Sequence, residues 1–410
     1  MGDKMEQQRI GRVYVGIDIH RLKHFVSILT ESFLKESESD WRKVGSFCIE
    51  NDIKSYRELE SAIIKEAADV NDVLVAIDHT GGHYCEPLVF FLTGKGYHVY
   101  HLESKAVKAA RERLLDEESK SDHLDASCAA YLLYLSDLHN ISLRIPRIEP
   151  ALRRDSDILN HLILQRDIYK KLITQCTNRL HQLLLATFPE GERRNFGSLL
   201  RVIPHYPTPF DIVQSDNLKG VKYLRQGYRE ELVQLANNTV GSPCAIYRDL
   251  ILDLSQQRCE YIEKRTGIER LIESQVDKHP YGEILRSFPF ISHITAATII
   301  SVIKDIERWP NKKKLKKAMG IYAFTKQSGS SVASRRRGRE GNRRARCALY
   351  LVALCMMGFK GGDNDFKNYY TRRVASGKPK KQALFATAGK ITEIIYHCLK
   401  NGEKYSYQGK

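Results

Sequence analysis

The chain has 410 residues, enough for two or three domains with a buried core, and carries a formal net charge of +16 at pH 7. Its nine cysteines are scattered without a C-x-x-C pair, which argues against a structural zinc site or a disulfide framework. The first residues lack an apolar signal core, and no uncharged stretch approaches the roughly 20 residues of a membrane span. We therefore expect a soluble protein of the cytoplasm.

The first segment, residues 11–140, shows the patterns of an α/β domain. Three short runs rich in β-branched residues predict an antiparallel meander, over residues 12–18, 24–30 and 43–49. Helices and buried strands are then predicted to alternate, with helices over 53–67, 84–95, 104–118 and 122–138 and strands over 73–78 and 97–102. The order βββαβαβα indicates one mixed sheet.

The second segment, residues 151–280, follows a proline-bearing linker and contains two long helical patterns. Apolar residues repeat every three, four or seven positions, at Ile158, Leu162, Tyr169, Leu172, Cys176 and Leu183 and again at Tyr247, Ile251, Leu254, Tyr261, Ile268 and Ile272. Such seams predict an antiparallel coiled-coil pair or a dimer stalk. The stretch between them, residues 189–244, has no pattern that we can assign.

The third segment, residues 281–405, is strongly basic and looks helical apart from one loop at 325–341. Residues 281–410 hold 27 Lys and Arg against 8 Asp and Glu, while the rest of the chain has a net charge of −3. Dense positive charge of this kind is typical of proteins that bind a polyphosphate, although a solvated face or a disordered tail is the alternative. The predicted nucleic-acid contacts are Lys312, Lys313, Lys314, Arg335, Arg336, Arg337, Arg339, Arg343, Arg344 and Arg346.

Four aspartates of the first segment form a candidate catalytic and metal site. Asp18 and Asp78 each end a predicted strand, and Asp122 and Asp125 stand three residues apart, on one face of a predicted helix. Carboxylates in this arrangement can hold two Mg²⁺ or Mn²⁺ ions about 4 Å apart and stabilise the in-line displacement at a phosphodiester. Taken singly, each aspartate could equally be a turn residue or a helix cap.

Four blocks of the sequence resemble a known family. GIDIHRLKHFVSIL, AIDHTGGHYCEPL, KSDHLDA and QSGSSVASRRRGREGNRRARCALY are similar to blocks of the serine-dependent transposases with a RuvC-like domain. This is the insertion-sequence family numbered one hundred and ten, which includes the bridge-RNA-guided recombinases and the Piv-type DNA invertases. The likeness covers roughly residues 12–138 and 283–405.

The resemblance implies both a fold and a chemistry. The first segment would be RNase H-like (RuvC-like), and the family's acidic tetrad would fall on Asp18, Asp78, Asp122 and Asp125. The family's nucleophilic serine would fall on Ser328, which would form a phosphoserine–DNA intermediate. The implied partners are the element ends, a target DNA, a structured guide RNA and further copies of the chain, whose pairing would bring one subunit's serine to another's acidic cluster.

The sequence departs from the family pattern at three points. Asp78 stands where the family has glutamate, and the turn TGGHY after it has one residue more than usual, so Glu86 is the next ligand to consider there. Phe290 and Ser292 replace both glycines of a hairpin through which relatives would bring backbone N–H groups to a phosphate, and we expect a packing role instead. Two alternatives to the recombinase remain open. One is a RuvC-type junction nuclease in which water attacks, and the other is an inactive nucleic-acid-binding scaffold.

Overall fold

The computed structural model describes most of the chain, namely residues 11–36, 44–67, 69–78, 84–102, 104–114, 121–139, 150–242, 244–326, 334–337, 340–358 and 364–406. Up to residue 139 the elements are β1 (Val13–Ile19), β2 (Lys23–Thr30), α1 (Glu31–Glu36), β3 (Ser46–Glu50), α2 (Ile53–Glu66), η2 (Val70–Asp72), β4 (Val73–Asp78), α3 (Glu86–Gly94), β5 (His98–Leu102), α4 (Ser104–Leu114) and α5 (Asp122–Leu138).

The remaining elements are almost all helical. They are α6 (Pro150–Thr187), α7 (Pro189–Val202), α8 (Pro209–Val213), α9 (Gln226–Asn237), α10 (Ala245–Lys278), α11 (Gly282–Arg286), α12 (His293–Ile303), η3 (Ile306–Arg308), α13 (Lys312–Ala318), β6 (Ala323–Lys326), β7 (Ser334–Arg337), α14 (Arg343–Met357), α15 (Asp365–Ala375) and α16 (Lys380–Asn401). None of the described helices combines the length and the apolar character needed to cross a membrane.

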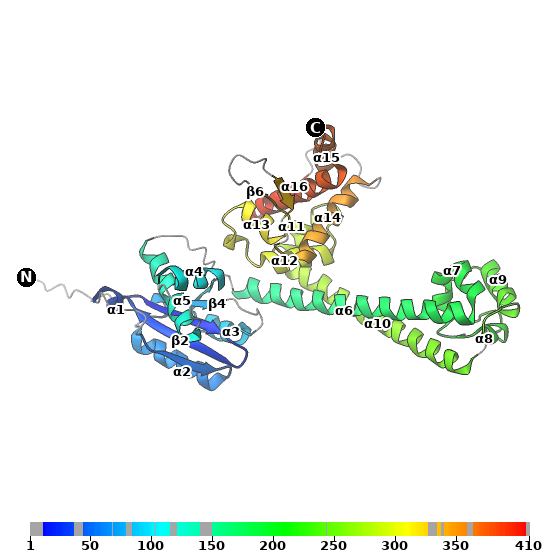
Figure 1. Ribbon diagram of the computed structural model, residues 1–410, viewed down its shortest axis with the longest axis horizontal. Helices are drawn as coiled ribbons and strands as arrows, with labels where there is room; N and C mark the ends of the chain where they lie inside the picture. Colours follow the sequence, from blue (N-terminus) through cyan, green and yellow to red (C-terminus); the bar gives the residue numbers. More distant parts are fainter. Residues whose placement is uncertain are drawn as a thin grey trace, which may run out of the picture. The chain divides into compact units, whose positions relative to one another are not determined.

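The N-terminal elements build one five-stranded sheet in the order β3-β2-β1-β4-β5 (Figure 1). The pairs β1–β2 and β2–β3 are antiparallel, whereas β1–β4 and β4–β5 are parallel. The mixed sheet predicted from the sequence is confirmed, and its strand order agrees with the RNase H-like fold that the resemblance implies. Helix α1 was not predicted, because six residues are too few to show a helical period.

Strand β1 lies at the centre of the sheet and is buried along its whole length. Its alternate residues Val13, Val15 and Ile17 belong to a core formed with α2 and α3. Tyr14, with the opposite pleat, belongs to a second core formed with α5. Side chains alternate across a strand, so the two cores cover the two faces of the sheet. Asp18 shares the pleat of Tyr14 and therefore lies on the α5 face.

Helices α6 and α10 run side by side in opposite directions (Figure 1). Within the pair, Arg166 Nε lies 2.7 Å from Glu269 Oε1, and Arg258 Nε donates to Thr177 Oγ1 at 3.0 Å. The antiparallel direction agrees with the predicted pairing, while the supercoil of a coiled coil stays a prediction. The stretch that we could not assign folds into α7, α8 and α9, which pack around Phe188 where α6 ends.

The basic C-terminal third is mainly helical, as expected, but the predicted loop at 325–341 is partly wrong. Strands β6 and β7 pair antiparallel, with Thr325 opposite Arg335 and Lys326 opposite Ser334. A run of arginines has little intrinsic strand preference, so this strand depends on pairing with a partner that a local pattern does not reveal. Seven residues, 327–333, connect the two paired ends and lie outside the described residues.

The chain divides into two compact units made of discontinuous segments. One contains residues 1–154, 303–340 and 392–401, and the other contains 155–302, 341–391 and 402–410. The C-terminal third thus contributes to both units. The three-domain division at 11–140, 151–280 and 281–405 stays a prediction.

Candidate metal centre

A close approach of backbones brings helix α5 onto strand β1. A Cβ atom on Gly16 would lie 2.0 Å from the carbonyl oxygen of Ala126 and 2.4 Å from the backbone nitrogen of Ala130. Only glycine leaves room for this approach, and the small Ala126 and Ala130 on the facing side of α5 allow it. The first turn of α5 therefore lies beside the C-terminal end of β1, where Asp18 stands.

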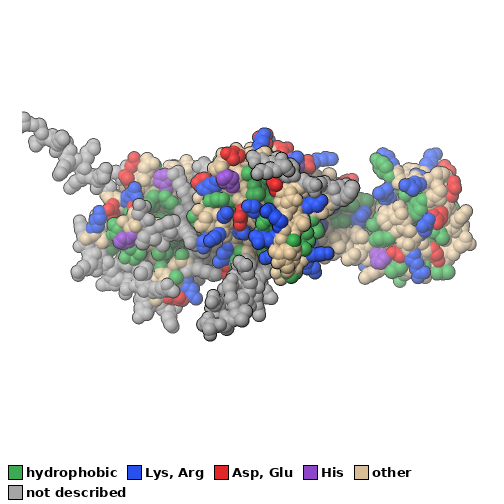
Figure 2. All heavy atoms as spheres, turned by 90° about the horizontal axis from the view of Figure 1, so that it is seen from above, with side chains coloured by type: hydrophobic (Ala, Val, Ile, Leu, Met, Phe, Trp, Pro, Cys, Tyr) green, Lys and Arg blue, Asp and Glu red, His purple; other side chains and the backbone are tan. Residues whose placement is uncertain are grey.

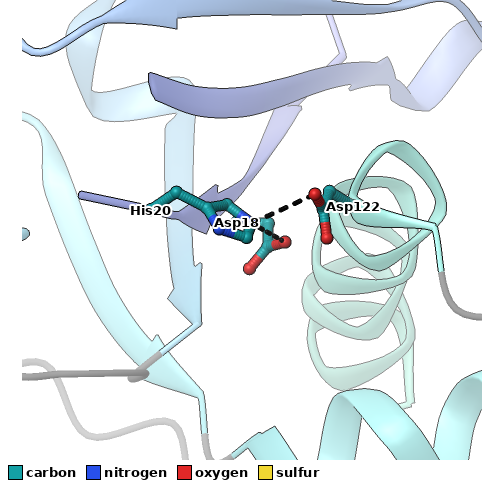
Figure 3. Close-up of side chains that lie close together, drawn as sticks. All are labelled: Asp18, His20 and Asp122. Carbon is teal, nitrogen blue, oxygen red and sulfur yellow. Dashed lines mark hydrogen bonds and ion pairs between the residues drawn. The ribbon is translucent and has the colours of Figure 1, made fainter. Parts of the chain in front are cut away.

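Three side chains meet at this end of the sheet (Figure 3). His20 Nε2 lies 3.0 Å from Asp18 Oδ2 and 3.4 Å from Asp122 Oδ2. One ligand atom from each residue falls within 4.8 Å of the other two, close enough for a single metal ion to contact all three. The side chain of Asp18 is only 5% exposed, while those of His20 and Asp122 are 39% and 35% exposed. The cluster thus has a buried anchor and an open side toward solvent.

His20 is a site residue that the sequence analysis missed. It follows Asp18 by two residues at the end of a strand, and this spacing places both side chains on one face of the sheet. The period-two rule was the signal that could have found it. Its backbone N–H donates to Lys23 O at 3.2 Å in the turn between β1 and β2. Its ring makes a T-shaped contact with the ring of Phe25, with centroids 5.6 Å apart and planes at 83°, so the turn positions the backbone of His20 and Phe25 limits the orientation of its imidazole.

Asp125 lies one turn further along α5 but does not join this group. Its Oδ1 accepts from Arg111 NH1 at 2.8 Å, and both residues are buried. The carboxylate is thereby neutralised by a guanidinium from α4. Burial, with Asp125 as the next cause, raises the pKa of the neighbouring Cys128 to about 12, so this thiol keeps its proton at neutral pH. The pair Asp122 and Asp125 thus divides between the open cluster and a buried ion pair.

The backbone of Asp78 ends strand β4 next to Asp18. Strands β1 and β4 are parallel, with Ile17 opposite Ile77, so the following residues, Asp18 and Asp78, stand level at the same edge of the sheet. Adjacent strands are about 4.8 Å apart, which is within reach of a shared ion. The side chain of Asp78 lies outside the described residues. Glu86, the alternative ligand, is half-buried in the first turn of α3.

The predicted nucleophile and several predicted phosphate contacts fall where no side chain is described. Ser328 and Arg339 lie outside the described residues, and Arg335, Arg336 and Arg337 are described only as the backbone of β7.

Some of the remaining basic residues form ion pairs within the fold, and others are exposed to solvent. Lys312 pairs with Glu393 at 3.4 Å and Arg344 pairs with Asp167 at 2.9 Å, so part of this charge is compensated within the fold. Lys313 and Arg343 are exposed, whereas Lys314 and Arg346 are half-buried. Figure 2 shows Lys and Arg side chains gathered on the C-terminal helices.

The hairpin between α11 and α12 contains a backbone conformation that usually favours glycine. Phe290 has a φ of 63°, in the left-handed region that a side chain rarely adopts. The neighbouring Phe288 is buried and stacks on Tyr405, with ring centroids 4.6 Å apart. Phe290 itself remains 39% exposed beside a cavity of about 700 Å³. The packing role expected for this segment is therefore carried by Phe288.

Comparisons with known proteins find transposase domains in two parts of the chain. A family model described as a transposase, of the DEDD type of IS110 elements, matches residues 15–189. A second model, described as "Transposase IS116/IS110/IS902 family", matches residues 282–371. The first match contains the four aspartates at the ends of β1 and β4 and in α5, and the second contains the basic loop with Ser328.

Two curated proteins are similar to this chain over nearly its full length. The "Insertion element IS110 uncharacterized 43.6 kDa protein" of Streptomyces coelicolor is 24% identical over 407 residues, which is 96% of this chain and 95% of that protein. The "Insertion element IS900 uncharacterized 42 kDa protein" of Mycobacterium paratuberculosis is 20% identical over 410 residues, or 96% and 97% of the two chains. The chain therefore carries the transposase domains of the IS110 family of insertion sequences.

Proposed function

We propose that this transposase cuts and rejoins DNA through a phosphoserine intermediate, with Ser328 as nucleophile and divalent metal held by Asp18, Asp78, Asp122 and Asp125. The observation that carries the proposal is the meeting of Asp18 and Asp122 at the end of β1, in a chain with both transposase domains. The buried carboxylate of Asp18 lies near the partly exposed carboxylate of Asp122. Such a pair is suited to binding a cation that also contacts a phosphodiester.

The donor set fits Mg²⁺ or Mn²⁺. Asp18 and Asp122 offer oxygen ligands, and the backbone position of Asp78 would add a third. Asp125, whose Oδ1 accepts a hydrogen bond from Arg111, would be the fourth ligand of this set. Such an ion would polarise the scissile phosphate and stabilise the charge that develops on its oxygens.

The serine and arginines would carry out the remaining steps. The hydroxyl oxygen of Ser328 would form a bond to phosphorus while the bond from phosphorus to one deoxyribose oxygen breaks. The serine loses its proton, and the released sugar hydroxyl gains one. Religation reverses these steps with a different hydroxyl. Arginines of the β7 segment would hold the phosphate by bidentate hydrogen bonds.

The proposed partners follow from charge and family. The basic residues around 312–314 and 335–346 would bind element ends, target DNA and a structured guide RNA through phosphate contacts. Ser328 and the acidic cluster are far apart in the sequence, with the α6–α10 pair between them, and we infer from the family resemblance that they meet in a composite site between copies of the chain. The α6–α10 pair is the element proposed to join those copies.

A cleavage assay on labelled DNA tests the metal site. Asp18→Asn and Asp122→Asn should each abolish cutting with Mg²⁺ or Mn²⁺ while hydrogen exchange shows a folded sheet, because each removes one charge from the cation site. Asp125→Asn should also abolish cutting, whereas Asp78→Glu should retain it. Full cleavage by Asp18→Asn and Asp122→Asn would refute the metal site, and absence of cutting by the wild type would favour the scaffold alternative.

A further inference from the structure

His20 lies between two carboxylates, and one proton on its ring nitrogen cannot form a full hydrogen bond to both of them. The same atom, Nε2, faces Asp18 Oδ2 at 3.0 Å and Asp122 Oδ2 at 3.4 Å. An imidazole nitrogen carries at most one hydrogen, so at most one of these two oxygens can receive a full hydrogen bond. A metal cation at this point could instead be bound by all three atoms. The lone pair of the imidazole Nε2 and one oxygen of each carboxylate would be its ligands.

The imidazole is built into its place. The backbone N–H of His20 closes the turn between β1 and β2, and Phe25, which pairs with Asp18 across the two strands, makes a T-shaped contact with the His20 ring. A ligand held by its neighbours loses little rotamer freedom when a metal binds. The ring is also 39% exposed, so an ion can reach it from solvent without opening the fold.

A nitrogen donor changes which ion the site prefers. Mg²⁺ takes oxygen ligands almost exclusively and gives up its waters reluctantly, whereas Mn²⁺ accepts both imidazole nitrogen and carboxylate oxygen. We propose that His20 is a nitrogen ligand of the metal site and makes it select Mn²⁺ over Mg²⁺. This inference rests on the proposed function, because that function includes a divalent metal ion bound by Asp18 and Asp122.

Pulsed electron paramagnetic resonance of Mn²⁺ bound to the full-length, untagged protein tests the nitrogen bond directly. We expect the echo of bound Mn²⁺ to carry modulation from a bonded histidine nitrogen. His20→Gln should remove this modulation. His123→Gln is the matched control and should retain it, because His123 is a neighbouring histidine whose ring bonds Ser46. Bound Mn²⁺ without nitrogen modulation in the wild type would overturn the proposal, whatever happens to the variants.

Selectivity gives a second readout that does not depend on activity. Titrating the free Mn²⁺ signal with and without competing Mg²⁺ yields both affinities. His20→Gln should weaken Mn²⁺ binding about tenfold or more, as expected when a metal site loses an orienting or bonding group. Mg²⁺ binding should change less than about threefold, because Mg²⁺ would not use the nitrogen. Equal losses for both ions would contradict the proposal.

The outcomes separate this inference from the function beneath it. If Mn²⁺ binds without nitrogen modulation and the protein still cuts DNA with Mg²⁺, the role of His20 fails and the metal-dependent transposase stands. If no Mn²⁺ binds at all, both the nitrogen ligand and the metal site at Asp18 and Asp122 fail together.

Discussion

The contact of β1 with α5 and the contact of α6 with α10 differ in how closely the elements approach and in how deeply their residues are buried. At the first, backbones almost touch at Gly16, every residue of β1 is buried, and the ion pair Arg111–Asp125 is enclosed. At the second, none of the described residues 164–175 or 256–271 is buried. Half-exposed contacts such as the stack of Tyr169 on Tyr261, with centroids 6.2 Å apart, hold the helices there.

The difference fits the roles that we propose for the two regions. Carboxylates that share an ion must be placed within fractions of an ångström, and a contact without free space fixes them. The middle of the helix pair leaves half-exposed apolar surface along its seam, which would suit the proposed role of joining copies of the chain. Substitutions should therefore have large effects at the first contact and small effects at the second.

The largest effect is expected when the buried ion pair is broken. Arg111→Met would leave the Asp125 carboxylate buried without its partner and should destabilise the β1–α5 region by about 3–5 kcal/mol. Hydrogen exchange of the β1 and α5 amides measures this loss. Arg166→Met removes the half-exposed pair with Glu269 and is the matched control, expected to cost less than about 1 kcal/mol. Equal costs at the two pairs would contradict the comparison.

A smaller but still clear effect is expected at Gly16. Gly16→Ala places a methyl group against the carbonyl of Ala126, so α5 must move outward, at a cost of about 1–3 kcal/mol. The same movement should separate Asp122 from Asp18 and weaken Mn²⁺ binding. Hydrogen exchange and a Mn²⁺ titration check the two consequences. Unchanged exchange and unchanged affinity would show that the close approach is not required.

The smallest effect should have the opposite sign. Gly267 lies inside α10, is exposed, and has no atom within 4 Å of an added Cβ. Gly267→Ala should therefore stabilise the helix by about 0.5–1 kcal/mol, because alanine has less conformational entropy to lose. Slower amide exchange in α10 would confirm this, and faster exchange would mean that another surface covers Gly267.

Sequence patterns predicted those features of the fold and site that depend on local hydrophobic periodicity. The strands of the mixed sheet follow from β-branched runs, and the aspartates at the ends of β1 and β4 follow from those strand ends. Residues set by tertiary contact were beyond such patterns. Arg111 reaches Asp125 only because of how α4 packs on α5, and Glu393 and Asp167, which compensate Lys312 and Arg344, are distant in sequence. His20 is different, since its spacing from Asp18 was visible and was overlooked.

The central claim is that Ser328 attacks DNA and becomes linked to it, and denaturing electrophoresis of labelled DNA tests this most directly. Wild-type protein with Mn²⁺ or Mg²⁺ should leave one DNA end attached to protein after denaturation, and Ser330→Ala and Ser331→Ala should do the same. Ser328→Ala should bind DNA and metal normally yet give neither the adduct nor a recombinant product, because only the attacking oxygen is missing. Continued nicking by Ser328→Ala, with no adduct from any variant, would contradict the account and identify a nuclease in which water attacks.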